Sequence, residues 1–366
     1  MNVLIETPTY WKREGSISVF DHPIPLNSKG WLKRYLRNVT NHSQFDSVKK
    51  LVLFPAPLTF EIESRVKNVS KGFDKIETFS LETLNMLKNM LKKHNFSKEF
   101  IRTINADTYP CVRNLGLIKG ALENADLLIL LDDDEIILDD NFMKKALETD
   151  GLHGKTGAYT AEGKFYLHVP EPPKWALKWQ KTELIAETIK KYIDSGKRFT
   201  ETSIALGGCM VITKELYQNV CFDPYIARGE DLDFLINAKH QNYKFLFDTR
   251  LAVEHLPPQG ANYFWPKFKG DIHRFIYERQ KIKDLRMDSE SFKPYPGDFL
   301  EEDLEERIIY TARNFEKDVL KKRESKLIKL TKIEIKKAKD YASKHSKRYV
   351  SYLSEWKKMM ALLPKI

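Results

Sequence analysis

Long hydrophobic runs are missing from this chain of 366 residues. No stretch approaches the roughly 18 uninterrupted apolar residues that a membrane-spanning helix needs. The first residues lack a basic segment followed by an apolar one, so no signal peptide is predicted. The three cysteines, Cys111, Cys209 and Cys221, are too few and too scattered for a disulfide framework or a thiolate zinc site. These absences together predict a cytoplasmic protein.

A glycine-rich phosphate loop is also missing. The short apolar run at 3–5 is followed by Thr7-Pro8-Thr9-Tyr10-Trp11, which has neither the glycines nor the basic residue of such a loop. A sugar nucleotidyltransferase would need that loop directly after its first strand. This enzyme class therefore remains only an alternative.

Positive charge is concentrated at one end of the chain. The net charge is +10, and residues 317–366 contain 16 Lys and Arg against 5 Asp and Glu. The rest of the chain is close to neutral. Such a basic tail is either a solvated helical face or a contact for an anionic surface, such as the inner face of the membrane or a polyanion.

Apolar segments of strand and helix type alternate along the first half. Proline follows two of the expected strands, at Pro8 and at Pro55, and we expect both strands to end there. The fully apolar run at 127–131 is typical of a parallel strand that is covered on both faces. The pattern predicts an α/β fold with an open, mostly parallel, doubly wound (Rossmann-like) sheet. The expected strands are 3–5, 51–54, 76–79 and 127–131, and the expected helices are 31–39, 60–69, 81–94 and 112–124.

The second half differs in composition. It is expected to contain strands at 159–168, within 205–213, at 245–247 and at 251–253, and helices at 175–192 and 230–240. Beyond Gly297 the sequence is Lys-rich and helical. We expect a catalytic domain over 1–295, with halves at about 1–140 and 141–295, and a helical extension over 296–366.

The acidic run Asp132-Asp133-Asp134-Glu135 follows the apolar strand directly. Four adjacent carboxylates beside a low-dielectric core repel one another unless a cation compensates. Two carboxylates spaced i, i+2 can reach one hard cation such as Mn²⁺ or Mg²⁺, and this cation would also bind a diphosphate. Capping of the next helix is the alternative, although capping needs only one or two acids.

Other polar residues lie where strands end or helices begin. Glu230 and Asp231 either cap a helix or include a general base. His255 follows a strand and is either structural or a ligand. Arg113 and Asn114 begin the helix before the acidic strand, where they are either exposed or close to a phosphate.

Small and aromatic residues suggest where a sugar could bind. The pair Gly207-Gly208 indicates either close packing or room for a sugar. The cluster Tyr263-Phe264-Trp265, beside two lysines, is suited to an acceptor-sugar platform.

In this order the motifs resemble the GT-A glycosyltransferases, particularly the large inverting family two. The resemblance covers about residues 1–260 and rests on Thr7-Pro8-Thr9-Tyr10, Val112-Arg113-Asn114-Leu115-Gly116, Asp132-Asp133-Asp134-Glu135, Gly207-Gly208, Glu230-Asp231 and His255. The family's acidic motif after the second strand is replaced here by Phe54-Pro55-Ala56-Pro57.

The resemblance implies a metal-dependent enzyme that moves a sugar from a nucleotide-sugar donor to a saccharide or lipid-linked acceptor, with inversion. It implies a role for each matched residue. The metal ligands would be Asp134, His255 and Asp132; the donor-binding residues Pro8, Thr9, Tyr10, Arg113, Asn114, Asp132 and Asp133; the acceptor-binding residues Gly207, Gly208 and Trp265; and the catalytic residues Asp231 as base with Glu230 in support.

A non-catalytic basic protein is the remaining alternative. A module that binds a membrane or a polyanion has no need for four acids at a strand end, and those acids repel nucleic-acid phosphates. We therefore expect no nucleic-acid partner.

Overall fold

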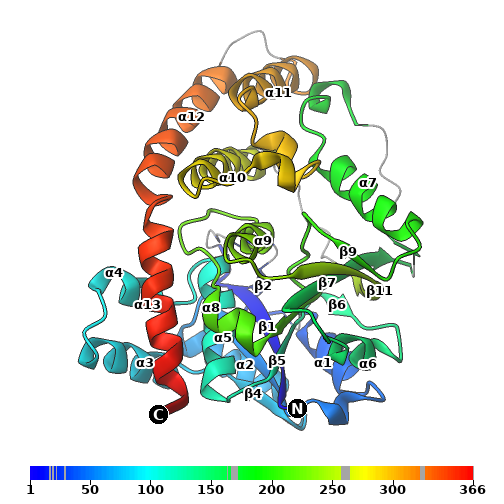
Figure 1. Ribbon diagram of the computed structural model, residues 1–366, viewed down its shortest axis with the longest axis vertical. Coiled ribbons are helices and arrows are strands. Elements are labelled where there is room, and N and C mark those ends of the chain that lie inside the picture. Colours follow the sequence, from blue (N-terminus) through cyan, green and yellow to red (C-terminus); the bar gives the residue numbers. More distant parts are fainter. Residues whose placement is uncertain are drawn as a thin grey trace.

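The computed structural model describes residues 1–365 except 16–17, 19, 22, 29, 163, 166–171, 257–263 and 322–325. One mixed sheet runs through the lower part of the molecule, and a group of helices lies above it (Figure 1). The strands in spatial order are β4 (Ile76–Thr78), β3 (Lys50–Ala56), β1 (Val3–Lys12), β5 (Leu127–Leu130), β10 (Met210–Thr213), β7 (Gly154–Ala161), β11 (Phe245–His255) and β6 (Glu135–Ile136).

Strand direction divides the sheet in two. The first four strands, β4 to β5, are parallel to one another. The strand β10 is antiparallel to both of its neighbours, β7 and β11 are parallel, and β6 is antiparallel to β11. Short strands pair at the margins: β2 (Ile24–Pro25) with β1, β8 (Lys164–Phe165) with β7, and β9 (Phe199–Glu201) with β11.

Alternating side chains of the central strands enter two separate cores, as strand geometry requires. Along β1, Leu4 belongs to the first core, whereas Val3 and Ile5 belong to the second. The second core is covered by α1 (Leu32–Thr40), α2 (Phe60–Ser70) and α6 (Phe142–Leu147). The first is covered by α3 (Leu81–Lys93), α4 (Lys98–Thr103), α5 (Tyr109–Leu122), α8 (Lys214–Asn219) and α9 (Glu230–His240). The predicted doubly wound α/β sheet is thus confirmed.

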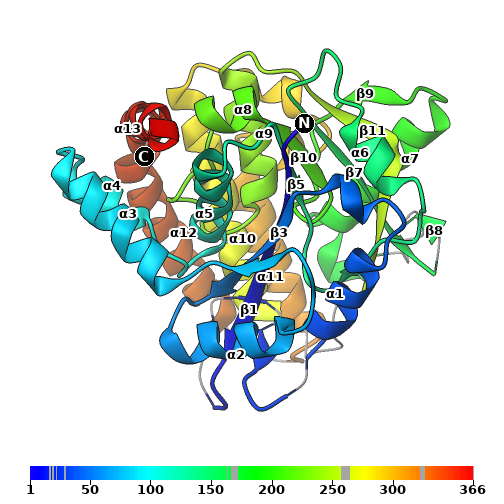
Figure 2. The ribbon, with the colours of Figure 1, turned by 90° about the horizontal axis from the view of Figure 1, so that it is seen from below.

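The C-terminal helix α13 (Arg348–Leu362) also belongs to the first core. Tyr349 and Trp356 are fully buried, and the indole of Trp356 donates a hydrogen bond to the backbone oxygen of Tyr217 at 3.0 Å. In the views of Figures 1 and 2 this helix lies beside α3 and α4, about 250 residues earlier in the chain, and Glu355 accepts hydrogen bonds from Ser97 there. The end of the basic tail is therefore part of the folded body.

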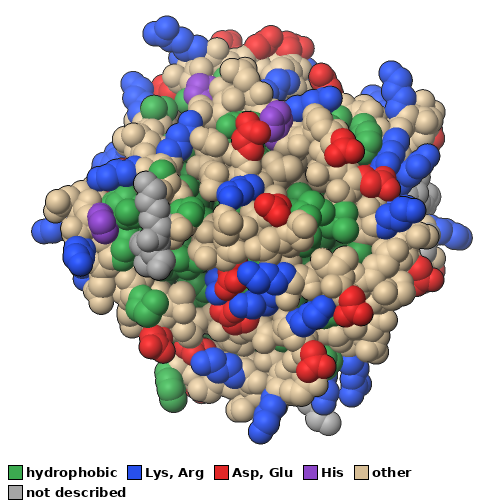
Figure 3. All heavy atoms as spheres, turned by 60° about the horizontal axis from the view of Figure 1, so that its bottom comes forward, with side chains coloured by type: hydrophobic (Ala, Val, Ile, Leu, Met, Phe, Trp, Pro, Cys, Tyr) green, Lys and Arg blue, Asp and Glu red, His purple; other side chains and the backbone are tan. Residues whose placement is uncertain are grey.

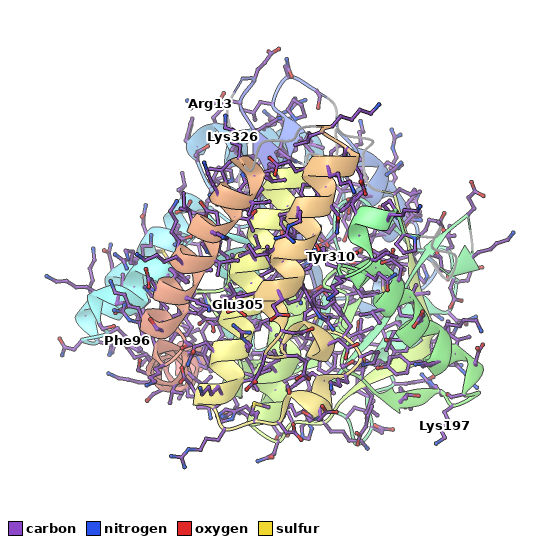
Figure 4. All side chains as sticks on the ribbon, turned by 90° about the horizontal axis from the view of Figure 1, so that it is seen from above. Arg13, Phe96, Lys197, Glu305, Tyr310 and Lys326 are labelled. Carbon is purple, nitrogen blue, oxygen red and sulfur yellow. The ribbon has the colours of Figure 1, made fainter. Side chains whose placement is uncertain are left out.

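A third core lies in the helical lobe, which we define as α7 (Lys181–Asp194), α10 (Phe264–Asp284), α11 (Leu304–Asp318) and α12 (Lys326–His345). Figure 4 looks down on this lobe, with the start of α12 marked by Lys326 and α11 by Tyr310. The indole of Trp179 packs edge-on against Phe268, Phe275 and Phe299. The helix α9 lies between lobe and sheet and contributes apolar side chains to the cores of both.

A buried ion network joins the lobe to the sheet. Lys281 of α10 is fully buried, and its ammonium donates hydrogen bonds to Asp223 at 2.7 Å and to Asp233 of α9 at 2.8 Å. The same ammonium lies 4.0 Å from the ring centroid of Tyr349 on α13. Because one cation contacts three segments, it fixes α9, α10 and α13 relative to one another.

Two of the predicted strand ends were wrong. The strand β1 continues through Pro8 to Lys12, and β3 continues through Pro55 to Ala56. In β1 the carbonyl of Glu6 faces β5 and accepts a hydrogen bond from the backbone nitrogen of Leu131. Because residues two apart in a strand face the same side, the nitrogen of Pro8 also faces β5. Since β5 ends at Leu130, no ladder partner is lost at Pro8. Likewise β4 ends at Thr78, before it could pair with Pro55.

Other elements also differ from the prediction. The segments 245–247 and 251–253 form one strand, β11, with a register shift between Phe247 and Ala252. The strand expected at 159–168 begins earlier, in β7, and residues 166–168 lie outside the described part. The helix expected at 175–192 begins only at Lys181, after a short 3-10 turn at Lys174–Ala176. Among the described residues, no helix combines the length and apolarity needed to span a bilayer.

Candidate functional site

A pocket of about 390 Å³ lies beyond the carboxyl ends of β1 and β5. Nine of the residues singled out from the sequence line it. They come from six separate segments of the chain, which the fold brings together here. These residues are Tyr10, Arg113, Asp132, Asp133, Asp134, Gly207, Glu230, Asp231 and His255.

The acidic run forms a tight turn between β5 and β6, in which two acids have structural partners. The backbone nitrogen of Glu135 donates to the carbonyl of Asp132, and the Glu135 carboxylate accepts from the backbone nitrogen of Asp132 at 2.9 Å. Asp133 turns away toward β1 and accepts hydrogen bonds from Thr9 at 2.5 Å and from the indole of Trp31 at 3.0 Å. Glu135 and Asp133 therefore shape the turn from within.

The other two acids, Asp132 and Asp134, have partners in the pocket. Asp132 accepts a hydrogen bond from Arg113 at 2.7 Å. Asp134 lies 3.5 Å from the Nε2 of His255, whose ring stacks on Tyr159. Strand pairing produces this second contact, because β6 places Glu135 opposite His255 at the end of β11.

Two of the three predicted metal ligands, Asp134 and His255, lie against each other in the pocket. Among the described residues, no three His, Cys, Asp or Glu side chains converge as a preformed metal site. Asp134 and His255 form a pair, and Asp132 lines the same pocket but is bonded to Arg113. Mg²⁺ is typically held by one or two carboxylates together with substrate phosphates, and a site with few protein ligands agrees with that pattern.

Burial is the main electrostatic influence on these acids. It is the largest cause of the raised pKa values of Asp132, Asp133 and Glu135, and it raises the pKa of Asp133 to about 8. The guanidinium of Arg113 lowers the pKa of Asp132 in opposition. Keeping several of these carboxylates ionised therefore requires positive charge in the pocket.

Arg113 connects the acidic turn to the second acidic motif. It comes from the second turn of α5, its side chain is only 4% exposed, and its Nε lies 4.0 Å from the carboxylate of Glu230. Its Nε and Nη1 have no hydrogen-bond partner among the described residues. A buried guanidinium with unused donors at a pocket wall can bind a phosphate or carboxylate.

The second motif begins α9. Gly229 has a φ of 68°, and Glu230 and Asp231 occupy the first helical turn, where the helix dipole favours negative charge. Asp231 accepts a hydrogen bond from the backbone nitrogen of Gly207 at 3.2 Å. Burial, followed by the charge of Asp231, raises the pKa of Glu230 to about 7. Asp231 thus faces the pocket in a fixed orientation, as a base for an acceptor hydroxyl would.

Three glycines of the sequence motifs leave room for buried charged side chains. A Cβ on Gly208 would lie 1.8 Å from Glu135, one on Gly207 2.8 Å from Arg113, and one on Gly116 2.0 Å from the buried carboxyl of Glu6. The space beside Gly207 and Gly208 is therefore occupied by side chains of the protein itself.

Several predicted residues lie outside the pocket lining. Asn114 is buried, and its side chain donates to and accepts from the backbone of Phe222. Thr9 acts behind Asp133, whereas Pro8 is part of the β1–β3 pairing. Trp265 lines a different, neighbouring cavity, and Tyr263 of the predicted platform lies outside the described residues.

The pocket has a wall that no sequence motif indicated. It is made of Lys181, Arg228, Arg274 and Tyr295, together with Tyr109 and Asp21. Arg274 fills the space where a Cβ of Gly229 would lie, at 2.3 Å, and donates to Glu278 and to Tyr295. The only sequence signal that could have indicated this wall is the position of Arg228 and Gly229 directly before Glu230. The other residues of the wall lie on separate elements.

Comparisons with known proteins bear on the fold. No protein-family model matches the sequence, and no curated protein matches it in sequence. A mannosyltransferase from Pyrobaculum calidifontis, solved with GDP-Man and Mn²⁺, is similar at a TM-score of 0.50 and 12% identity, over 99% of this chain and 86% of that one. Glucosyl-3-phosphoglycerate synthase from Mycobacterium tuberculosis gives a TM-score of 0.43 at 11% identity, over 78% and 81%. The first likeness shows that this chain has the GT-A-type fold predicted for it.

Proposed function

We propose that this protein is a metal-dependent glycosyltransferase, which moves a hexose from a nucleotide-sugar donor to an acceptor hydroxyl with inversion. One observation carries the proposal: a single pocket brings together the acidic turn, His255, the unpaired donors of Arg113 and the carboxylate of Asp231. The likeness in fold to a mannosyltransferase solved with GDP-Man and Mn²⁺ supports it.

Each side of the reaction has residues in this pocket. Asp134 and His255, with Asp132, would hold Mn²⁺ or Mg²⁺, and the cation would supply charge stabilisation for the departing diphosphate. Arg113 would bind a diphosphate oxygen with its free donors. Asp231 would accept the proton of the attacking hydroxyl, while the buried Glu230 supports it from the same helical turn.

A screen of possible donors tests the proposed function directly. Nucleoside diphosphates and their sugars are added with and without Mn²⁺, and the melting temperature of the protein is measured. At least one nucleotide should raise it only when the metal is present. If no nucleotide stabilises the protein in either condition, the proposal is wrong. Asp134→Asn should abolish the metal-dependent part, whereas Asp46→Asn, an exposed acid outside the pocket lining, should not.

We also propose that the protein works in peripheral contact with an anionic membrane. The outward face of α12 exposes Lys329, Lys332 and Lys336 together with Leu330 and Ile333. Basic and apolar residues in this arrangement suit a surface of acidic lipid. By contrast, the face shown in Figure 3 has basic and acidic side chains interspersed. We place the contact at α12 and not at the whole tail, because one face of α13 packs into the first core.

A further inference from the structure

A large apolar groove adjoins the pocket. It has a volume of about 970 Å³ and lies between α7, α10 and the end of α11. Its walls include Trp175, Phe264, Trp265 and Phe315. The rings of Phe264 and Phe315 stack at 3.7 Å, and Trp175 packs edge-on against both. At one end Val319 and Leu320 are 47% and 44% exposed, so apolar surface continues toward solvent.

The groove and the pocket meet at a boundary where three cations lie beside carboxylates. Lys181, Thr182 and Arg228 line both cavities. Lys181 is paired with Asp271, and Arg228 with Asp21 at 3.2 Å, but the side chains of both cations remain 25% exposed. Beside them, Arg274 is 4% exposed, and its Nη2 has no hydrogen-bond partner among the described residues. A buried guanidinium with an unused donor marks a place for an anionic group.

We infer that the acceptor is an anionic amphiphile, a lipid with a negatively charged head group and a free hydroxyl. Its anionic group would lie at Lys181, Arg228 and Arg274, and its hydrocarbon chain in the groove. The unused donor of the buried Arg274 selects an anionic head group, and the continuity of the two cavities places the chain. This inference rests on the proposed function, whose acceptor it specifies.

The chemistry follows from that placement. The hydroxyl oxygen of the lipid forms a bond to the anomeric carbon of the donor sugar, and the bond from that carbon to the diphosphate breaks. The hydroxyl proton passes to Asp231, which shares the pocket with Arg228 and Arg274. The negative charge leaves with the nucleoside diphosphate, so neither an oxidant nor a further reactant is needed.

The test uses three probes below their micelle concentrations: decyl phosphate, inorganic phosphate and decyl maltoside. Binding to the full-length protein is measured by calorimetry and by tryptophan fluorescence, since Trp175, Trp179 and Trp265 line the groove. Decyl phosphate should bind at least about 100-fold more tightly than inorganic phosphate, because burial of roughly four methylene groups already gives that factor. Equal affinity for these two probes, or equal affinity for decyl phosphate and decyl maltoside, would overturn the inference.

Variants separate the two parts of the site. Trp265→Ala should weaken decyl phosphate about tenfold and leave inorganic phosphate unchanged, whereas Arg228→Gln should weaken both. Phe60→Ala, which removes a 79% exposed aromatic residue of α2, is the matched control and should change neither. If Trp265→Ala binds decyl phosphate as the unaltered protein does, the groove is not the binding site.

A failure of this inference can be distinguished from a failure of the proposed function. Metal-dependent nucleotide binding without decyl phosphate binding would overturn this inference and leave the glycosyltransferase proposal standing. Decyl phosphate binding without any nucleotide binding would overturn the acceptor role together with the proposed function. Simultaneous, metal-dependent binding of both ligands is the expected result.

Discussion

On one side of the pocket three adjacent carboxylates, Asp132 to Asp134, come from a single run at the end of one strand. On the other side Lys181, Arg228 and Arg274 come from α7, from the loop before α9, and from α10. The acidic run is continuous in sequence, and Arg113 from α5 and His255 from β11 are added to it by the fold. The second side exists only because the helical lobe packs over the sheet. The comparison indicates that a short motif supplies the acidic turn, whereas tertiary packing supplies the opposite wall of the pocket.

The largest expected effect is that of replacing Asp231, which shares the pocket with the acidic turn. We expect Asp231→Asn to lower turnover by about 10²–10⁴-fold, because a positioned general base contributes that much. Affinity for the donor with Mn²⁺ should stay nearly unchanged, since Asp231 contacts the backbone of Gly207 and not the acidic turn. Release of nucleoside diphosphate measures the first quantity and calorimetry the second. Equal losses of turnover and of donor affinity would contradict a role as base.

The packing of the lobe depends on the buried ammonium of Lys281. Replacement of Lys281 by Met leaves Asp223 and Asp233 buried without their cation, which should cost about 3–5 kcal/mol of unfolding free energy. Lys283→Met, on an exposed position of the same helix, is the matched control and should stay within about 0.5 kcal/mol. Urea denaturation measures both. A small loss for Lys281→Met would mean that the lobe is held mainly by its apolar core.

The same contrast explains what the sequence could predict. The apolar run at 127–131 followed by acids identified β5 and the acidic turn, since both depend on neighbours in sequence. The ends of β1 and β3 could not be predicted, because Pro8 and Pro55 are tolerated only where the adjacent strand has already ended. Asn114 matched a motif, yet the fold uses it to hold the backbone of Phe222. Arg274 had no motif, and only the packing of α10 against Gly229 brings it to the pocket.

The buried pair of Arg274 and Glu278 should also affect how the free energy of unfolding depends on pH. Burial raises the pKa of Glu278 to about 7, although Arg274 opposes the shift. The folded protein therefore binds a proton that the unfolded chain releases near pH 4.3, and stability should fall as pH rises between these two values. Glu278→Gln should remove this part of the slope, on the order of 4 kcal/mol across the window. Thermal denaturation from pH 4 to 8 measures it, and an unchanged slope would show that Glu278 is ionised throughout.

The smallest expected effect concerns the outer face of the lobe. Replacement of Lys329, Lys332 and Lys336 by Gln should weaken binding to phosphatidylglycerol vesicles by about 1 kcal/mol for each lysine at low salt. Replacement of Lys33, Lys71 and Lys92, which are exposed on α1, after α2 and on α3, alters net charge equally and should have little effect. Vesicle sedimentation compares the two triple variants. Charge substitution is preferable to deletion of 317–366, because deletion would remove the buried side chains of Tyr349 and Trp356 and destabilise the sheet. Equal losses for both variants would mean that net charge alone attracts the protein, and that the face of α12 has no special role at the membrane.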